Sequence, residues 1–175
     1  LAAQLEGSKA FCKDFLHRNN IPTAFYKTFT EAEEAKLYVK EKGTPIVIKA
    51  DGLAAGKGVI IANTTQEAVN TIDDMLEGNR FGDAGSRVVI EEFLVGEEAS
   101  FIVMVDGSNI LPMATSQDHK ARDNDDKGPN TGGMGAYSPA TIVSPAIFDE
   151  VMDTVIKTTV NAMQSEGMPY SGFLY

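Results

Sequence analysis

Short apolar runs separated by glycine, proline and polar residues recur along the whole chain, a pattern typical of a mixed α and β protein. Two runs rich in Ile and Val lie within residues 44–62, and a glycine-rich loop joins them. They predict a strand, a loop and a second strand. Further strands are expected at residues 24–29, 87–93 and 98–105, then after a turn at 106–109 to about residue 117, and from 171 onward.

Helices are predicted where apolar residues recur every three or four positions behind a capping residue. Ser8 precedes one that runs to about Arg18, and Ser144 with Pro145 opens a long one. Thr–Glu pairs with capping-box spacing open two more, Thr30 with Glu33 ending at Gly43 and Thr64 with Glu67 ending at Gly78. The elements predict two α+β lobes, at 21–90 and from 91 onward.

The loop after Lys49 carries the first chemical signal. Gly52, Gly56 and Gly58 allow backbone amides to approach a ligand, and with Lys49 and Lys57 they favour a phosphate group. The spacing is one residue short of a P-loop, and a strand follows where a P-loop needs a helix. A flap over a polyphosphate remains the preferred interpretation, and a solvated surface hairpin is the alternative.

A hinge rich in carboxylates follows the next strand. Glu91 and Glu92 end that strand, Gly96 allows a bend, and Glu98 begins the following segment. Because adenine needs a hydrogen-bond acceptor and a ribose diol suits a carboxylate, one glutamate from each side of the bend could hold a nucleoside. A solvated acidic turn is the alternative.

Residues 118–139 show no hydrophobic pattern and are expected to be an irregular loop. Gly132 and Gly133 beside Met134 suggest backbone shaped to a small ligand, whereas 121–128 could equally be disordered without one. His119 could contact a ligand, transfer a proton or make a structural hydrogen bond.

A protein-kinase interpretation of Lys49 fails, since no glycine loop precedes it.

Composition narrows the class of protein. The chain has 175 residues, 43% hydrophobic and 23% charged, which is enough to bury a core, and its net charge of −10 disfavours nucleic acid or an anionic membrane as partner. The single Cys12 excludes an internal disulfide. No apolar run approaches the ~20 residues that span a bilayer, and no signal peptide is visible, so a cytoplasmic location is expected. The absence of an initiator Met and the strand beginning at 171 predict a fragment of a longer chain.

Several motifs together resemble the phosphoribosylamine–glycine ligases (glycinamide ribonucleotide synthetases) of the ATP-grasp superfamily. The resemblance covers essentially the whole chain and rests on Leu5-Glu-Gly-Ser-Lys-Ala-Phe11, Ile46-Val-Ile-Lys-Ala-Asp-Gly-Leu-Ala-Ala-Gly-Lys-Gly58, Glu91-Glu-Phe-Leu94, Gln117-Asp-His-Lys120 and Gly128-Pro-Asn-Thr-Gly-Gly-Met-Gly-Ala136. It implies an α+β ATP-grasp fold with the nucleotide between two lobes. The expected parts are a linking helix at 1–20 packed on the second lobe, a small lobe with the phosphate flap at 21–90, and a truncated second lobe at 91–175.

The resemblance also implies roles for individual residues. The residues expected to hold ATP are Lys9, Lys49, Gly52, Gly56, Lys57, Gly58, Glu91, Glu92, Phe93, Leu94, Glu98, Lys120 and Asn130. Those expected at the amino-acid substrate are His119, Gly132, Gly133 and Met134. Many relatives carry Arg directly after the lysine of the Asp-His-Lys motif, whereas here Ala121 stands there and Arg122 follows, so the role of Arg122 is left open. No catalytic residue is assigned.

The implied reaction joins glycine to 5-phosphoribosylamine through a glycyl phosphate at the expense of ATP, in purine synthesis. Magnesium is implied, with ligands beyond residue 175, and the ribosyl phosphate is expected to need a domain before residue 1. This chain is therefore expected to carry the ATP-binding part and to be inactive without those N- and C-terminal domains. The alternatives are an ATP-grasp ligase for another carboxylic acid and a nucleotide-binding module without catalysis.

Overall fold

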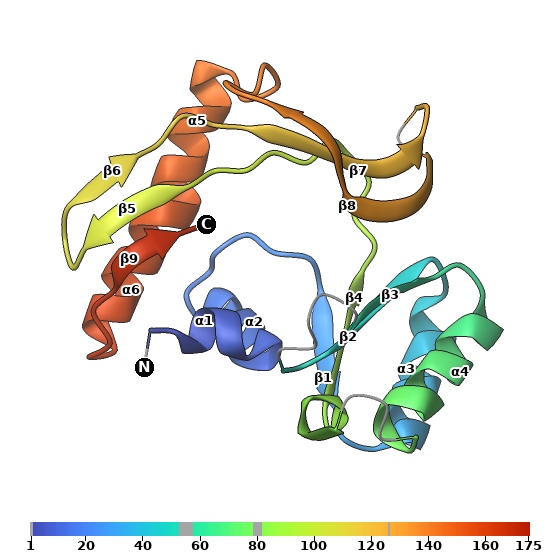
Figure 1. Cartoon of the computed structure of the whole chain (residues 1–175). Helices are drawn as coiled ribbons and strands as arrows, with labels where there is room; N and C mark the ends of the chain where they lie inside the picture. Colours follow the sequence, from blue (N-terminus) through green and yellow to red (C-terminus); the bar gives the residue numbers. More distant parts are fainter. Residues whose placement is uncertain (1, 53–57, 79–81, 126) are drawn as a thin grey trace. The chain divides into compact units, whose positions relative to one another are not determined.

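The computed structural model describes residues 2–52, 58–78, 82–125 and 127–175. The chain divides into two compact units, 3–95 and 96–175, and each is described by itself (Figure 1). The division falls a few residues later than the boundary expected at residue 91. The reason is that strand β4 (Val88–Glu92) is hydrogen-bonded within the first unit, and its last residue pairs with Ile46.

A four-stranded antiparallel sheet forms the centre of the first unit. Its strand order is β1 (Tyr26–Phe29), β4, β2 (Ile46–Ala50) and β3 (Val59–Ala62). Strands β2 and β3 are the two apolar runs of the sequence, and Lys49 lies opposite Val59 in their register. The two predicted strands are confirmed.

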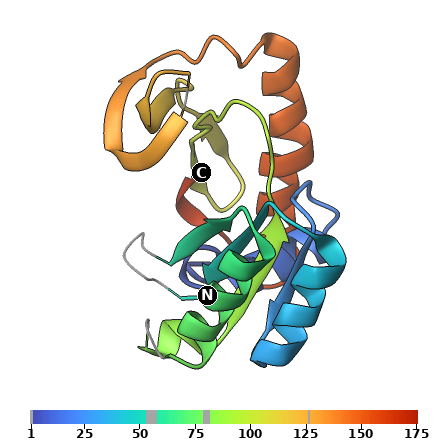
Figure 2. The same cartoon turned by 90° about the vertical axis from the view of Figure 1, so that its right-hand side faces the viewer.

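Helices cover both faces of this sheet. Helices α3 (Ala32–Lys42) and α4 (Thr65–Leu76) pack side by side on one face, where Ile48, Ile72 and Ile90 are fully buried (Figure 2). Successive side chains of a strand point to opposite faces. Glu91 therefore points to the other face, where α2 (Lys9–Arg18), preceded by the short α1 (Gln4–Gly7), contributes Lys13.

Two expectations about the helices of the first unit are corrected. Residues 1–20 were expected to pack on the second lobe, but α2 is tied to the first unit through hydrogen bonds to Asp51 and an ion pair to Glu91. The capping box at Thr64 and Glu67 forms, whereas the one expected at Thr30 does not, because α3 begins one residue later with Glu31 as its uncapped N-cap.

The second unit packs a three-stranded antiparallel sheet on one long helix. The strand order is β6 (Ile110–Pro112), β5 (Val103–Asp106), β9 (Ser171–Leu174). The helix consists of α5 (Pro145–Val151), a π-helical turn η2 (Met152–Ile156) and α6 (Lys157–Ser165), with Ser144 as N-cap. The core residues that join sheet and helix are Val103, Val105, Met152, Ile156 and Val160.

The second unit differs from the sequence prediction in three places, one of which is that the strand expected to reach about residue 117 ends at Pro112. Residues 117–137 form a two-stranded antiparallel hairpin, β7 (Gln117–Asp123) and β8 (Lys127–Tyr137), where an irregular loop was expected. Most of its side chains are exposed, so the pairing leaves no alternation of apolar residues in the sequence. The strand expected from residue 98 begins only at Val103, and Ser100 makes a single bridge to Ser116. Over the described residues, no helix combines the length and apolar character that crossing a membrane requires.

Candidate functional site

Asp51 fixes the start of α2 against the end of β2. Its Oδ1 accepts a hydrogen bond of 2.7 Å from the backbone N–H of Ala10, and the Ser8 hydroxyl donates to the same oxygen at 3.0 Å. Arg87 forms an ion pair with Oδ2 and donates Nε to it at 3.0 Å. Burial alone would raise the pKa of Asp51, but the bonds from Ala10, Arg87 and Ser8 outweigh it and lower that pKa below the usual aspartate value.

Lys9, predicted to contact the phosphates or the adenine ring edge of ATP, lies at the first position of α2. Its ammonium Nζ donates to the carbonyl oxygen of Gly52 at 3.0 Å, and its backbone N–H donates to the carbonyl oxygen of Asp51 at 3.2 Å. The Asp51 network therefore holds Lys9 at the point where the chain leaves β2 for the predicted phosphate loop. A cation fixed beside such a loop is suited to bind an anion.

Lys49 occupies the same end of β2, and its ammonium forms an ion pair with Oε1 of Glu91 on the neighbouring strand. Lys13 of α2 forms an ion pair with Oε2 of the same carboxylate. Burial lowers the pKa of Lys49 below that of a solvent-exposed lysine, and the positive charges of Lys13 and Lys9 lower it further. The sequence predicted Lys49 and Glu91 as separate ligand contacts, and the structure brings them together.

The structure describes two of the four other predicted residues of this loop, Gly52 and Gly58. Gly52 is needed for packing, because a Cβ there would lie 2.8 Å from the Cβ of Ala84 in the 3₁₀ turn η1 (Gly82–Gly85). The Gly58 carbonyl accepts from the backbone N–H of Ala50 at 2.8 Å. The predicted ligands Gly56 and Lys57 lie outside the described residues.

The segment after β4 is the predicted adenine contact. The Glu92 backbone N–H donates to the carbonyl of Phe25 at 3.0 Å, and its carboxylate accepts a long bond from the Phe25 N–H. Within the described ranges, no backbone hydrogen bond uses Phe93 or Leu94, and the Leu94 side chain is 66% exposed. The backbone donors and acceptors of these two residues are therefore available to a ligand.

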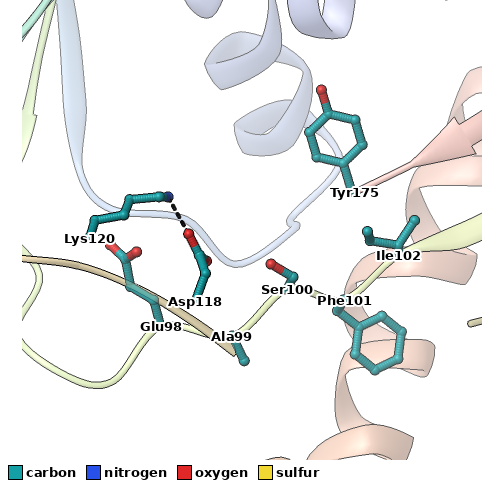
Figure 3. A pocket seen from close by; sticks show the side chains of 8 residues that line it. All are labelled: Glu98, Ala99, Ser100, Phe101, Ile102, Asp118, Lys120 and Tyr175. Atoms are coloured by element: carbon teal, nitrogen blue, oxygen red, sulfur yellow. Dashed lines mark ion pairs between the residues drawn. The ribbon is translucent and has the colours of Figure 1, made fainter. Parts of the chain in front are cut away.

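A pocket of about 390 Å³ within the second unit brings two predicted ligands together. It is lined by Glu98 and Ser100 before β5, by Asp118 and Lys120 of β7, and by Tyr175. Figure 3 shows Glu98, Asp118 and Lys120 grouped on one side of the pocket, with Tyr175 across from them. The Lys120 ammonium is 3.5 Å from Oδ2 of Asp118. A lysine beside carboxylates and a phenol can bind both hydroxyl and anionic groups.

The remaining predicted substrate residues lie on the β7–β8 hairpin. His119 packs against the ring of Tyr137, with 5.6 Å between ring centroids, on the opposite face of β7 from Asp118 and Lys120. Gly132, Gly133, Met134 and Asn130 belong to β8. Only Gly133 among the glycines of this group has a left-handed backbone, at φ 132°, and Met134 is 59% exposed. Arg122 pairs with its exposed neighbour Asp123.

The sequence analysis did not single out several residues of the ionic networks in the first unit and of the pocket in the second. Asp51, Arg87 and Lys13 were not singled out in the first unit, nor was Asp118 in the second. Asp51 and Asp118 each stand within two positions of a predicted lysine, which was an available signal. Lys13 and Arg87 carried no local signal, because their partners are far away in the sequence. The residues that the structure describes contain no group of three His, Cys, Asp or Glu side chains able to hold a metal ion.

Comparison with solved structures defines the class of protein. The two units, with a lysine-bearing hairpin in the first and a Glu–Lys pocket in the second, form an ATP-grasp domain, as the match of an ATP-grasp domain model over residues 7–175 shows. A 2-oxoglutarate carboxylase biotin carboxylase domain from Hydrogenobacter thermophilus, solved with MgADP and bicarbonate, has the same fold at a TM-score of 0.73 and 21% identity, covering 98% of this chain and 36% of that one.

Within that class, the chain belongs to the phosphoribosylglycinamide synthetase ATP-grasp (A) domain family, whose model matches residues 7–175. A phosphoribosylamine–glycine ligase from Vibrio parahaemolyticus is 70% identical over 174 residues, which are 99% of this chain and 41% of the relative. The crystal structure of the ligase of that name from Thermotoga maritima matches with a TM-score of 0.88 and 36% identity, over 98% of this chain and 43% of that one. The chain thus spans about two fifths of the length of its relatives.

Proposed function

We propose that this chain is the nucleotide-binding part of an enzyme that ligates glycine to 5-phosphoribosylamine at the expense of ATP. The observation that carries the proposal is the placement of Lys9 and Lys49 at the same end of β2, within a chain whose family match extends over 7–175. Two cations beside a hairpin loop are suited to stabilise the negative charge of a transferring phosphoryl group.

The roles within the first unit follow from the contacts. Lys9 and Lys49 bind the phosphate groups of ATP, with the loop residues Gly56, Lys57 and Gly58 as further expected contacts. The backbone of Phe93 and Leu94 binds the edge of the adenine ring, since its donors and acceptors are otherwise unused in the described chain. Glu92 flanks this segment.

The roles within the second unit are those of a ribose and substrate pocket. Glu98 accepts hydrogen bonds from the ribose hydroxyls, and Lys120 supplies a positive charge. Gly132, Gly133 and Met134 border the glycine substrate, with Asn130 and His119 on the same hairpin. The exposure of this hairpin supports a surface that becomes covered when substrates bind.

The chemistry requires that ATP phosphorylates the glycine carboxylate and that the amine of 5-phosphoribosylamine then displaces phosphate. A magnesium ion would screen the phosphate charges. Among the described residues, no group of three carboxylate, imidazole or thiol side chains converges to hold a metal ion by itself. We therefore assign no residue of this chain to the metal, and we expect its ligands beyond residue 175.

A chimeric enzyme tests the function. The chain replaces the matching 174 residues of the Vibrio parahaemolyticus ligase, and ADP release is measured with glycine and 5-phosphoribosylamine. We expect release that needs both substrates and that Lys49→Met reduces by about 100-fold or more. Release with another acid, such as D-alanine or bicarbonate, would favour a different ATP-grasp ligase. Nucleotide binding without turnover would favour a non-catalytic module.

A further inference from the structure

Two lysines share one buried carboxylate in the first unit. Glu91 is 3% exposed, and its two oxygens form ion pairs with different residues, Oε1 with Lys49 and Oε2 with Lys13. The cluster therefore carries two positive charges and one negative charge. A single lysine would suffice to neutralise Glu91, so the second cation has a charge to offer to another anion.

The two lysines are not held equally. Lys13 lies on α2, its side chain is 15% exposed, and its ammonium also donates to the hydroxyl of Thr23 at 2.7 Å. Lys49 lies at the end of β2, its side chain is 29% exposed, and no hydrogen bond to another described residue is found beyond its pair with Glu91. Lys13 is thus the less exposed of the two lysines and is also hydrogen-bonded to Thr23, whereas Lys49 is the more exposed partner of Glu91.

We propose that Lys13 is a positioning residue that keeps Glu91 neutralised, so that Lys49 can move from Glu91 to the phosphate groups of a bound nucleotide. This inference rests on the proposed function, because it assigns a nucleotide to Lys49. Lys13 itself does not touch the ligand. It acts by setting the electrostatic cost of releasing Lys49.

The physical argument concerns the carboxylate that would be left behind. If Lys13 were absent, Lys49 would be the only cation among the described residues that is paired with the nearly fully buried Glu91. A nucleotide that drew Lys49 away would then leave an unpaired buried charge, which is strongly unfavourable. With Lys13 present, the carboxylate keeps a partner, and Lys49 is available. Removing the charge of Glu91 should therefore cancel the need for Lys13.

The test is isothermal titration of the 175-residue chain with MgATP. We expect Lys13→Met to weaken binding by about tenfold or more, since it makes release of Lys49 costly. The double variant Lys13→Met/Glu91→Gln should bind within about threefold of the wild type, because no buried carboxylate remains to hold Lys49. Lys42→Met is the matched control. It removes a lysine of α3 that pairs with Glu41, and it should leave the affinity unchanged.

Four outcomes overturn the inference or separate it from the proposed function. Unchanged binding by Lys13→Met contradicts it, and so does a double variant as weak as Lys13→Met, which would mean that Lys13 touches the ligand or only supports the fold. If Lys13→Met does not fold, as judged by circular dichroism, Glu91→Gln alone decides. Tighter MgATP binding by Glu91→Gln than by the wild type supports the inference. MgATP binding that Glu91→Gln weakens by about tenfold means that Glu91 contacts the nucleotide. A wild-type chain that does not bind MgATP contradicts the proposed function itself.

Discussion

The backbone N–H of Ala10 donates to Oδ1 of Asp51 across 2.7 Å, and this bond joins the first turn of α2 to the residue that follows β2. A carboxylate at a helix N-terminus satisfies amides that have no partner within the helix and also interacts favourably with the helix dipole. Because Lys9 precedes Ala10 and Lys49 lies two residues before Asp51, the same bond fixes two predicted phosphate ligands. Stability and the proposed nucleotide binding therefore both involve this side chain.

Replacing Asp51 should measurably destabilise the chain. Asp51→Asn loses the charge that Arg87, Ser8 and Ala10 bind, and we expect about 2 kcal/mol less free energy of unfolding near neutral pH, as for other charged hydrogen-bonded groups. Urea denaturation measures the change. Asp153→Asn is the control, since its exposed pair with Lys157 should contribute less than about 0.5 kcal/mol. An equal loss from both variants would contradict this assignment.

The contribution of Asp51 should vanish in acid. Its pKa is lowered in the folded state, so it stabilises the fold above the unfolded-state pKa, about 3.9, and the contribution is lost as the pH falls through the lower folded-state pKa. The difference in unfolding free energy between the wild type and Asp51→Asn should be constant from about pH 7 to 5 and shrink below about pH 4. Denaturation at a series of pH values checks this, and a difference that grows in acid would give the sign opposite to the prediction.

Gly52 should tolerate no side chain. Gly52→Ala places a Cβ 2.8 Å from the Cβ of Ala84, and we expect a loss of about 1–3 kcal/mol, as for other overpacked sites. Thermal unfolding measures it. Gly135→Ala is the control, because a Cβ there would have no heavy atom within 4 Å. The double variant Gly52→Ala/Ala84→Gly should recover part of the lost stability. If it recovers none, the clash with Ala84 is not the cause of the destabilisation.

The two predicted capping boxes give a matched comparison. Thr64→Ala removes a side-chain oxygen that accepts from the Glu67 N–H at 3.2 Å, and it should cost about 1 kcal/mol. Thr30→Ala should cost less than about 0.5 kcal/mol, because α3 has no side-chain cap. The denaturant midpoints of the two variants measure the two losses of stability. Equal losses would show that the α3 cap forms in solution.

The sequence predicted the first unit better than the second. Its strands and helices carry strong apolar periodicity, so β2, β3 and α4 were assigned correctly, and Lys49 was placed at a strand end. The β7–β8 hairpin was missed because its side chains are exposed and many are glycine, which leaves backbone pairing without an apolar pattern. An expected helix N-cap also moved from Thr30 to Glu31, a shift that local propensity does not determine.

The sequence predicted several residues of the candidate site, but it did not predict which of them pair with one another. Motif resemblance indicated Lys9, Lys49, Glu98 and Lys120. The links from Lys13 to Glu91 and from Arg87 to Asp51 join residues 36 or more positions apart, and such partners depend on how the sheet and α2 pack. The role of Gly52 likewise became visible only in the structure, where it lies beside Ala84. The sequence alone does not show whether a glycine in a predicted phosphate-binding loop is needed for packing or for close approach of a ligand.

The most direct test of the central claim compares MgATP binding by the wild-type chain and by Lys49→Met. We expect the wild type to bind and to gain about 2.7 kcal/mol of stability at a ligand concentration 100 times the Kd, which is a rise in Tm of about 5–10 °C. Lys49→Met should lose most of this gain while remaining folded. A wild-type chain whose Tm does not change with MgATP, or a variant with the same rise in Tm as the wild type, would contradict the account.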